Sequence, residues 1–439
     1  MTSPLIFLFF FCSLLFSLYI KISLLYPLLL GLAAFTISAY FRGHSLPDLL
    51  TMMLKGSRQS LLVIRIFVLI GIITAVWRAC GTIPFIVYYG IAYLSEQYFV
   101  LSAFILSSLM SFLLGTSFGT VGTMGVILMV LARSGQVDIN VAAGAIIAGA
   151  YFGDRCSPMS SSANLVAVLT RTRLYLNLAN MLKSSVLPFL AACAGYAYFS
   201  LRYPLIGEDN PIVAAIPQAF DLNPVALAPA LLILALAALR IDVKVSMGLS
   251  SLAGMAIAVY VQQVSPAELL EYITTGYRLN QPGPLSDVMQ GGGLLSMVQV
   301  SLIVLISSAY SGLFAGTGLL RDIERAYEFI SRKVGTYAGT VITSFATVAF
   351  ACNQTLAVML THQLTQGAYE KKRLSRYRLA LDLENTVIVI SALIPWNIAG
   401  AVPAAALSAD SGFIPYALYL YFVPLANFFT QKASIKEEP

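Results

Sequence analysis

The chain has 439 residues, of which 58% are hydrophobic and only 10% are charged, and its mean hydropathy is +0.82. Soluble domains are less apolar and carry more charge, so this composition excludes a water-soluble fold. The formal net charge of +6 does not indicate a nucleic-acid partner, because basic residues gather in the cytoplasmic loops of any polytopic membrane protein.

The chain begins with an apolar stretch, MTSPLIFLFFFCSLLFSLYI, that lacks the basic start and the small-residue cleavage site of a secretory signal. We expect a retained first helix. Apolar runs of spanning length recur, for example at 24–41, 226–239 and 297–319. Since about 20 residues cross a bilayer, the sequence predicts an all-α polytopic membrane protein with about ten transmembrane helices.

Basic clusters predict the orientation. The loop 42–65 carries four basic residues, which places it in the cytoplasm together with the N-terminus, and the polar tail 431–439 is expected there as well. Basic clusters at 321–333 and 371–378 lie on the same side, so the apolar segment 334–360 between them must enter and leave on one side. It is too short for two crossings, which predicts a re-entrant hairpin.

The segment 99–132 is expected to form a second hairpin of opposite orientation, as an inverted repeat would produce. The alternative is a pair of short tilted helices without functional meaning. Residues 72–86 resemble residues 306–320 and share a Gly-Thr, at Gly81-Thr82 and Gly316-Thr317; prolines follow these glycines by 77 and 79 residues, at Pro158 and Pro395. The predicted organisation is N-terminal transmembrane helices at 1–60, a first repeat at 61–202, connecting helices and loops at 203–295, a second repeat at 296–430, and the tail.

Helix breaks are predicted at Gly81, Pro158 and Pro395, within broken helices at 141–170 and 382–405. Such breaks are tolerated at membrane depth only where the freed backbone groups face protein or a water-filled cavity. Paired breaks in two halves of a chain indicate the midplane site of a transporter. The candidate ion-binding or substrate-binding residues carry polar or ionisable side chains on the hairpins and broken helices: Thr116, Ser117, Thr120, Thr123, Asp154, Ser157, Ser160, Ser161, Asn164, Asn353, Gln354, Thr355, Glu384, Asn385 and Asn397.

Asp154 and Glu384 are the strongest candidates, because an ionisable residue within a spanning segment is costly unless it functions. Two structural alternatives remain: Asp154 could form an ion pair with Arg155, and Glu384 could snorkel to the membrane surface or cap a helix. The oxygens of this set suit a weakly bound sodium ion or a small polar solute. Five single cysteines and two histidines predict neither a zinc site nor a disulfide framework, and no cofactor is expected.

Four motifs look familiar: GTIP at 81–84, GTSFGTVGTMG at 115–125, GAYFGDRCSP at 149–158 and IPWN at 394–397. Together they resemble the NhaC-type sodium/proton antiporter family of the ion transporter superfamily, in order and over roughly residues 65–403. The resemblance implies an inverted-repeat fold in which a transport domain moves past a scaffold. It also implies secondary active exchange of sodium for protons, with some relatives exchanging organic acids such as malate and lactate.

Three positions depart from the family pattern, and each loses a negative charge. Ser161 replaces an aspartate, Asn353 stands where relatives have Asp before Gln354, and Asn385 follows Glu384 where relatives have Glu-Asp.

A sodium/proton exchanger needs a group that binds a proton when sodium leaves, and only Asp154, Asp382 and Glu384 can serve here. Two functions therefore remain open. One is sodium/proton antiport by alternating access, and the other is sodium- or proton-coupled transport or exchange of a small organic acid or amino acid.

Other classes fit less well. An aspartyl protease would need a second carboxylate motif besides the YFGD at 151–154, and no H-E-x-x-H is present, so an enzyme is not expected. A channel could use polar hairpins as a filter, but broken helices after each hairpin favour alternating access. We expect a multi-pass protein of the cell membrane whose partners are small ions or a small organic solute and the lipid bilayer, with a homodimer expected by analogy.

Overall fold

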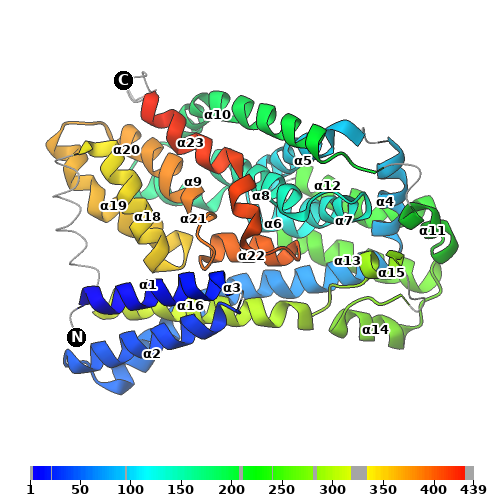
Figure 1. Ribbon diagram of the computed structural model, residues 1–439, viewed down its shortest axis with the longest axis horizontal. Coiled ribbons are helices and arrows are strands. Elements are labelled where there is room, and N and C mark those ends of the chain that lie inside the picture. Colours follow the sequence, from blue (N-terminus) through cyan, green and yellow to red (C-terminus); the bar gives the residue numbers. More distant parts are fainter. Residues whose placement is uncertain are drawn as a thin grey trace.

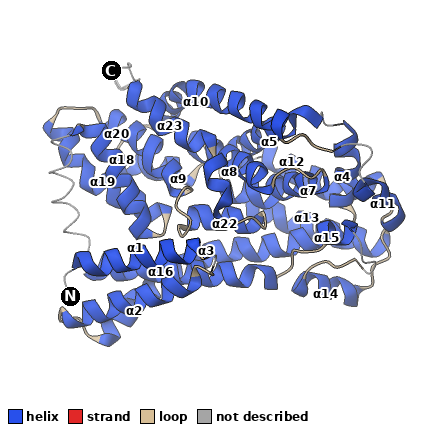
Figure 2. Cartoon of the chain, in the orientation of Figure 1, coloured by secondary structure: helices blue, strands red, loops and turns tan. Residues whose placement is uncertain are grey.

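The computed structural model describes residues 3–20, 22–93, 96–206, 211–239, 241–279, 284–317 and 334–430. Over these ranges the chain is helical, and a single β-bridge between Tyr277 and Gly291 is the one strand-like contact there (Figure 2). The basic cluster 321–333 and the tail 431–439, which carried part of the orientation argument, lie outside the described residues.

Helices up to residue 202 build the first part of the chain. They are α1 (Ser3–Tyr19), α2 (Leu25–Phe41), α3 (Leu46–Ala79), α4 (Thr82–Tyr93), α5 (Phe99–Leu114), α6 (Ser117–Thr120), α7 (Val126–Ser134), α8 (Ile139–Cys156), α9 (Ser161–Thr170) and α10 (Leu174–Arg202). Short helices η1 (Glu96–Tyr98) and η2 (Val121–Gly125) join their neighbours without a break, and η2 is a π-helix.

Two further groups of helices follow. The connecting region contains α11 (Pro211–Ala219), η3 (Pro224–Leu227), α12 (Ala228–Ala238), α13 (Val243–Tyr260), α14 (Pro266–Thr275) and α15 (Pro284–Met289). The last part contains η4 (Leu295–Met297), α16 (Val298–Thr317), α18 (Thr336–Ala351), α19 (Gln354–Lys371), α20 (Arg376–Leu383), the π-helix η5 (Glu384–Ile388), α21 (Val389–Ser391), α22 (Ile398–Ala406), η6 (Ser411–Tyr416) and α23 (Leu418–Phe429).

Long apolar helices mark a multi-pass membrane protein. Five described helical stretches are long and apolar enough to span a bilayer: Glu96–Leu114, Ser117–Ser134, Leu174–Arg202, Val243–Tyr260 and Leu295–Phe314. A sixth is α3, which bends by 45° between Leu46–Arg58 and Val63–Ala79. Shorter apolar helices make up much of the rest, so the number of about ten spans stays a prediction.

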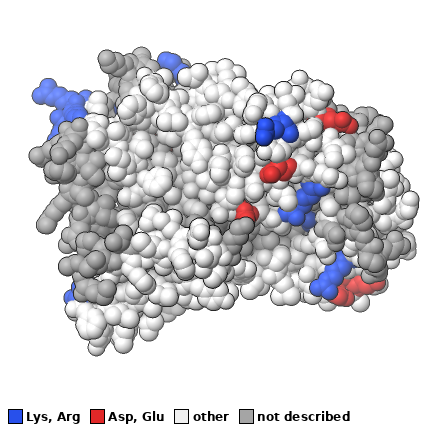
Figure 3. Space-filling model, in the orientation of Figure 1, with Lys and Arg blue, Asp and Glu red and all other residues white. Residues whose placement is uncertain are grey.

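The surface fits a lipid environment. Large apolar side chains are exposed along α10, where Leu187 and Leu190 are each 61% exposed. Figure 3 shows a face that is mostly uncharged, with Lys, Arg, Asp and Glu in a few separate patches. Since lipid tails are apolar, exposed leucines on such a helix need no protein partner.

A layer of α1, α2, α3 and α16 lies along one long side of the molecule (Figure 1). Two glycines allow α3 and α16 to cross closely. A methyl group added at Gly56 would lie 2.3 Å from the Ser308 carbonyl oxygen, and one at Gly312 would lie 2.1 Å from the Met52 carbonyl oxygen. Small residues at such crossings let two backbones touch, which is how helices associate within a membrane.

A second close crossing joins α5 to α8. Gly149 and Gly153 form a G-x-x-x-G pattern on α8, and a methyl group added at Gly153 would lie 2.0 Å from the Ser111 carbonyl carbon. At Gly149 the added methyl would lie 2.5 Å from the carbonyl oxygen of Phe104. The crossing fixes the end of α8, and the next residue after Gly153 is Asp154.

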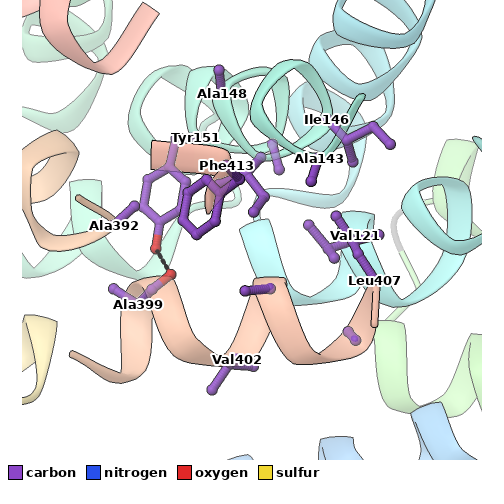
Figure 4. Close-up of a cluster of buried hydrophobic side chains, with 14 of the residues drawn as sticks. Val121, Ala143, Ile146, Ala148, Tyr151, Ala392, Ala399, Val402, Leu407 and Phe413 are labelled. Atoms are coloured by element: carbon purple, nitrogen blue, oxygen red, sulfur yellow. Dashed lines mark hydrogen bonds between the residues drawn. The ribbon is translucent and has the colours of Figure 1, made fainter. Parts of the chain in front are cut away.

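The opposite side of α8 packs against the end of the chain. Figure 4 shows Tyr151 of α8 beside Ala399 of α22 and Phe413, and the Tyr151 hydroxyl donates a hydrogen bond of 2.7 Å to the Ala399 carbonyl oxygen. The C-terminal third of the chain therefore covers the helix that carries Asp154.

Both segments expected to be hairpins consist of two helices joined by a short turn. In the first, α5 ends at Leu114, its C-cap Gly115 has a left-handed φ of +67°, and α6 begins at Ser117. In the second, Cys352 at φ +54° separates α18 from α19. Helix α19 continues to Lys371, past the expected end at residue 360, although its last turns are polar. Whether either segment is re-entrant stays a prediction.

The predicted breaks fall outside helices. Gly81 has a φ of +81° between α3 and α4. Pro158 lies in the interruption 157–160 between α8 and α9, and Pro395 lies in the interruption 392–397 before α22.

Candidate functional site

Asp154 lies in the last turn of α8 and is only 5% exposed. Its carboxylate is within hydrogen-bonding reach of the Gln354 side chain and the Ser117 backbone. Ser117 is the first residue of α6 and Gln354 is the first residue of α19. The turns of both helix pairs, more than 200 residues apart in the chain, therefore meet at one buried carboxylate.

The helix starts supply the chemistry at this point. The first N–H groups of a helix have no partner within the helix and carry part of its positive dipole, so they favour a nearby carboxylate. Asn353 is the N-cap of α19, and its side-chain oxygen accepts a 2.8 Å hydrogen bond from the Thr355 backbone N–H. The cap orients the first turn that presents Gln354.

Arg155 follows Asp154 in sequence but turns away from it. Its buried guanidinium donates to the side chains of Ser184, Ser185, Tyr419 and Asn385, and to the Met181 carbonyl oxygen. It forms no ion pair with any carboxylate of the described residues. The first structural alternative, an Asp154–Arg155 ion pair, is therefore wrong.

Glu384 is the first residue of the π-helix η5 and is only 1% exposed. Neither carboxylate oxygen has a hydrogen-bond partner among the described residues, and its charge interacts with those of Arg155 and Asp154. A buried carboxylate of this kind neither snorkels to the membrane surface nor caps a helix, so the second structural alternative is also wrong. π-helical turns within α-helices are frequent at functional sites.

Asp382, the third candidate for proton binding, is fully partnered. Its side-chain oxygens accept hydrogen bonds from the Tyr369 hydroxyl at 2.8 Å and the Asn427 amide at 2.8 Å, and it forms an ion pair with Arg378 at 3.3 Å. A carboxylate held by a cation and two further donors contributes to stability, and it has little capacity left for cargo.

The serines of the first break divide into two groups. Ser160 donates to the Asp154 carbonyl oxygen, and Ser162 donates to the same oxygen at 2.7 Å, which ties the break to the end of α8. The Ser157 hydroxyl accepts from the Met159 backbone N–H at 3.2 Å. Ser161 and Asn164 are exposed on α9, and the Asn164 side-chain amide donates to the Ser160 carbonyl oxygen at 2.6 Å, which ties the start of α9 to the break.

The remaining polar candidates lie on the helix pairs and the second break. Thr120 and Thr123 are buried and donate to carbonyl oxygens of their own helix, at 2.9 and 2.7 Å. Thr116 is half-buried and Thr355 is exposed. Asn397 is a structural residue: it caps α22 at the Ala399 backbone N–H and donates to the Val348 carbonyl oxygen at 2.9 Å.

Sequence reasoning did not identify the partners of Arg155. Ser184 and Ser185 lie on α10, and Tyr419 lies on α23. The Tyr419 hydroxyl is 3.0 Å from an Arg155 nitrogen. Their spacing along the chain carries no signal. The signal was Arg155 itself, because a buried guanidinium without a carboxylate requires several neutral acceptors nearby.

Two cavities contain residues named above. One of about 450 Å³ reaches Pro395 of the second break and is lined by small residues of α22, with Gln299 and Asp410 among its polar groups. The other, of about 320 Å³, lies between α9, α19 and α20 and is lined by Arg171, His362 and Tyr369, among others. The second cavity thus includes the tyrosine that binds Asp382.

Comparison with known proteins gives a consistent result. The profile of the Na+/H+ antiporter family matches residues 149–430. The chain is 28% identical over 411 residues to the Na+/H+ antiporter NhaC of Bacillus subtilis, covering 91% of this chain and 90% of that protein. It is 26% identical to the malate-2H+/Na+-lactate antiporter of the same organism, over 87% of this chain and 83% of that protein.

A third relative is the arginine/ornithine antiporter ArcD of Halobacterium salinarum, 26% identical over 91% of this chain and 84% of that protein. The family profile covers more than half of the chain and contains Asp154, Glu384 and the breaks at Pro158 and Pro395. This chain belongs to the Na+/H+ antiporter family.

Proposed function

We propose that this protein is a secondary active transporter that exchanges sodium for protons at Asp154. The observation that carries the proposal is the position of this carboxylate: it is buried, has no cationic partner among the described residues, and meets the first turns of α6 and α19. A buried carboxylate of this kind is stable only with a cation or a proton bound to it.

Competition for one carboxylate couples the two fluxes. Sodium is a hard cation that prefers oxygen ligands, and the Asp154 carboxylate, which the Gln354 side chain and the Ser117 backbone hold in place, supplies the charged one. A proton on the carboxylate removes the negative charge that holds sodium, so sodium leaves when the proton binds. If the site can turn from one side of the membrane to the other only with sodium or a proton bound, the sodium gradient and the proton gradient are coupled.

We propose two cavities as the access routes that alternating access requires. The cavity of about 450 Å³ reaches the second break, and the cavity of about 320 Å³ lies where α9, α19 and α20 end. We assign the latter to the cytoplasmic side, because Arg171 and Arg376 lie there. The same proposal includes a cell-membrane location, cytoplasmic termini, about ten spans in an inverted repeat with re-entrant hairpins, and a homodimer.

A second candidate is exchange of a small organic acid or amino acid. Arg155 Nε and Asn385 Nδ2 are buried donors without a partner among the described residues, and a substrate carboxylate would satisfy them. The names of two relatives, a malate/lactate antiporter and an arginine/ornithine antiporter, also support it.

Proteoliposomes that enclose a pH-sensitive dye separate the two functions. A pulse of sodium or lithium alone should change the internal pH if the protein is a sodium/proton antiporter. Potassium is the control for ionic strength. If cations alone give no response, and malate, lactate or an amino acid is required, the second candidate replaces the first.

A further inference from the structure

Three charged side chains lie together at the proposed site without a direct ion pair. Asp154, Arg155 and Glu384 are 5%, 0% and 1% exposed, and the Glu384 charge interacts with both others. The nearby Asp382 is already paired with Arg378, so it adds no net charge. The site therefore carries two negative charges and one positive charge when all three groups are ionised.

Arg155 is a fixed charge rather than a mobile one. It donates hydrogen bonds to α10, to Tyr419 of α23 and to Asn385 of η5, so three separate elements hold its guanidinium. The groups that face it are Glu384, Cys156 and Tyr419. Arginine does not lose its proton in proteins, so the positive charge stays through any transport cycle.

Glu384 complements this fixed charge. Both of its oxygens lack a partner among the described residues, and the neighbouring donors Arg155 Nε and Asn385 Nδ2 lack one as well. The two unused acceptors belong to Glu384, one unused donor belongs to its chain neighbour Asn385, and the other belongs to Arg155, from which the Asn385 side-chain oxygen already accepts. Buried polar atoms are nearly always satisfied, and a bridging water has the size and hydrogen-bonding capacity to join such groups.

We infer that Arg155 and Glu384 form an internal charge pair, so that Asp154 alone exchanges its cation and each sodium ion is exchanged for one proton without net charge movement. The inference rests on the proposed antiport function. With the pair internally neutral, the site has one negative charge, which a single sodium ion or a single proton cancels. Since uncancelled charge is costly within a bilayer, these two neutral forms are the ones that cross.

The first test is electrical. In proteoliposomes, a potassium gradient with valinomycin sets the membrane potential while a dye reports sodium-driven proton flux. The flux of the wild-type protein should be independent of the potential, and a solid-supported membrane should record no transport current. A sodium-driven proton flux that carries current would overturn the inference and leave antiport intact. If the wild-type protein gives no flux at all, the proposed function fails instead.

The second test removes the paired charges one at a time and then together. Glu384→Gln leaves the buried charge of Arg155 uncompensated near the site, which disfavours a bound cation, so flux should fall by about tenfold or more. Arg155→Gln frees Glu384 to bind protons, so flux should persist and now carry current. The double variant restores one negative charge, and its flux should return to within about threefold of the wild-type rate because coupled substitutions are not additive.

Matched controls come from exposed residues far from the site. Glu271→Gln on α14 and Arg278→Gln just after α14 remove the same charges and should leave flux unchanged. Size-exclusion profiles in detergent verify that every variant folds. If the double variant folds and is as inactive as Glu384→Gln, then Glu384 binds the cargo itself and the internal pair does not exist.

Discussion

Asp154→Asn tests the exchanging carboxylate with a side chain of nearly the same size. The substitution keeps hydrogen-bonding capacity toward Gln354 and the Ser117 backbone but removes the negative charge. For unit charges about 4 Å apart, at an effective dielectric constant of about 20, the lost attraction is about 4 kcal/mol. That energy corresponds to a loss of about 10³-fold in sodium affinity. We therefore expect no measurable sodium-driven proton flux.

The assay is the dye-loaded proteoliposome, with the sodium concentration varied over several decades. The control is Asp221→Asn, because Asp221 is exposed and, among the described residues, its hydrogen bonds are made by its backbone. Retention of more than about a tenth of wild-type flux by Asp154→Asn would be inconsistent with the calculated loss and would refute the role of this residue.

Three further predictions concern stability and stoichiometry. Gly153→Ala forces a methyl group against the α5 backbone, so the free energy of unfolding should fall by about 1–3 kcal/mol and the melting temperature in detergent should fall with it. The control Gly248→Ala has open space around the added methyl and should leave the melting temperature unchanged. Asp382→Asn leaves Arg378 buried without its counter-charge, so the free energy of unfolding should fall by about 3–5 kcal/mol in thermal melts. An unchanged melting temperature would contradict the pairing. Asn385→Asp places a carboxylate where the amide oxygen now accepts from the Arg155 guanidinium. The new carboxylate pairs with Arg155, so Glu384 is free to bind and release protons and transport currents should appear. Their absence would count against the internal pair.

The positions of the helix breaks could be predicted from local chemistry. Proline within an apolar run cannot continue a helix without losing a hydrogen bond, and the structure is non-helical at both Pro158 and Pro395. The end of α19 could not be predicted in the same way. Residues 361–371 are too polar for a spanning segment, yet they contain no proline and about half of them are good helix formers, so the helix continues to Lys371.

Burial of Asp154 and Glu384 followed from the cost of charge in a membrane, but their surroundings did not. Contacts between Asp154 and Gln354 join residues 200 positions apart, and no pattern along one chain reveals such a pair. The sequence also does not indicate which of the neighbouring serines contacts Asp154. Ser161 faces outward and Ser162 inward because the rotation of α9 after the break decides which side chain reaches the Asp154 carbonyl.

Proton release on sodium binding is the most direct test of the central claim that one carboxylate alternates between the two cations. Isothermal titration of the purified protein with sodium, repeated in buffers of different ionisation enthalpy, counts the protons released. The wild-type protein should release one proton for each sodium ion bound, and Asp154→Asn should bind no sodium. Sodium binding without proton release in the wild-type protein would contradict the account.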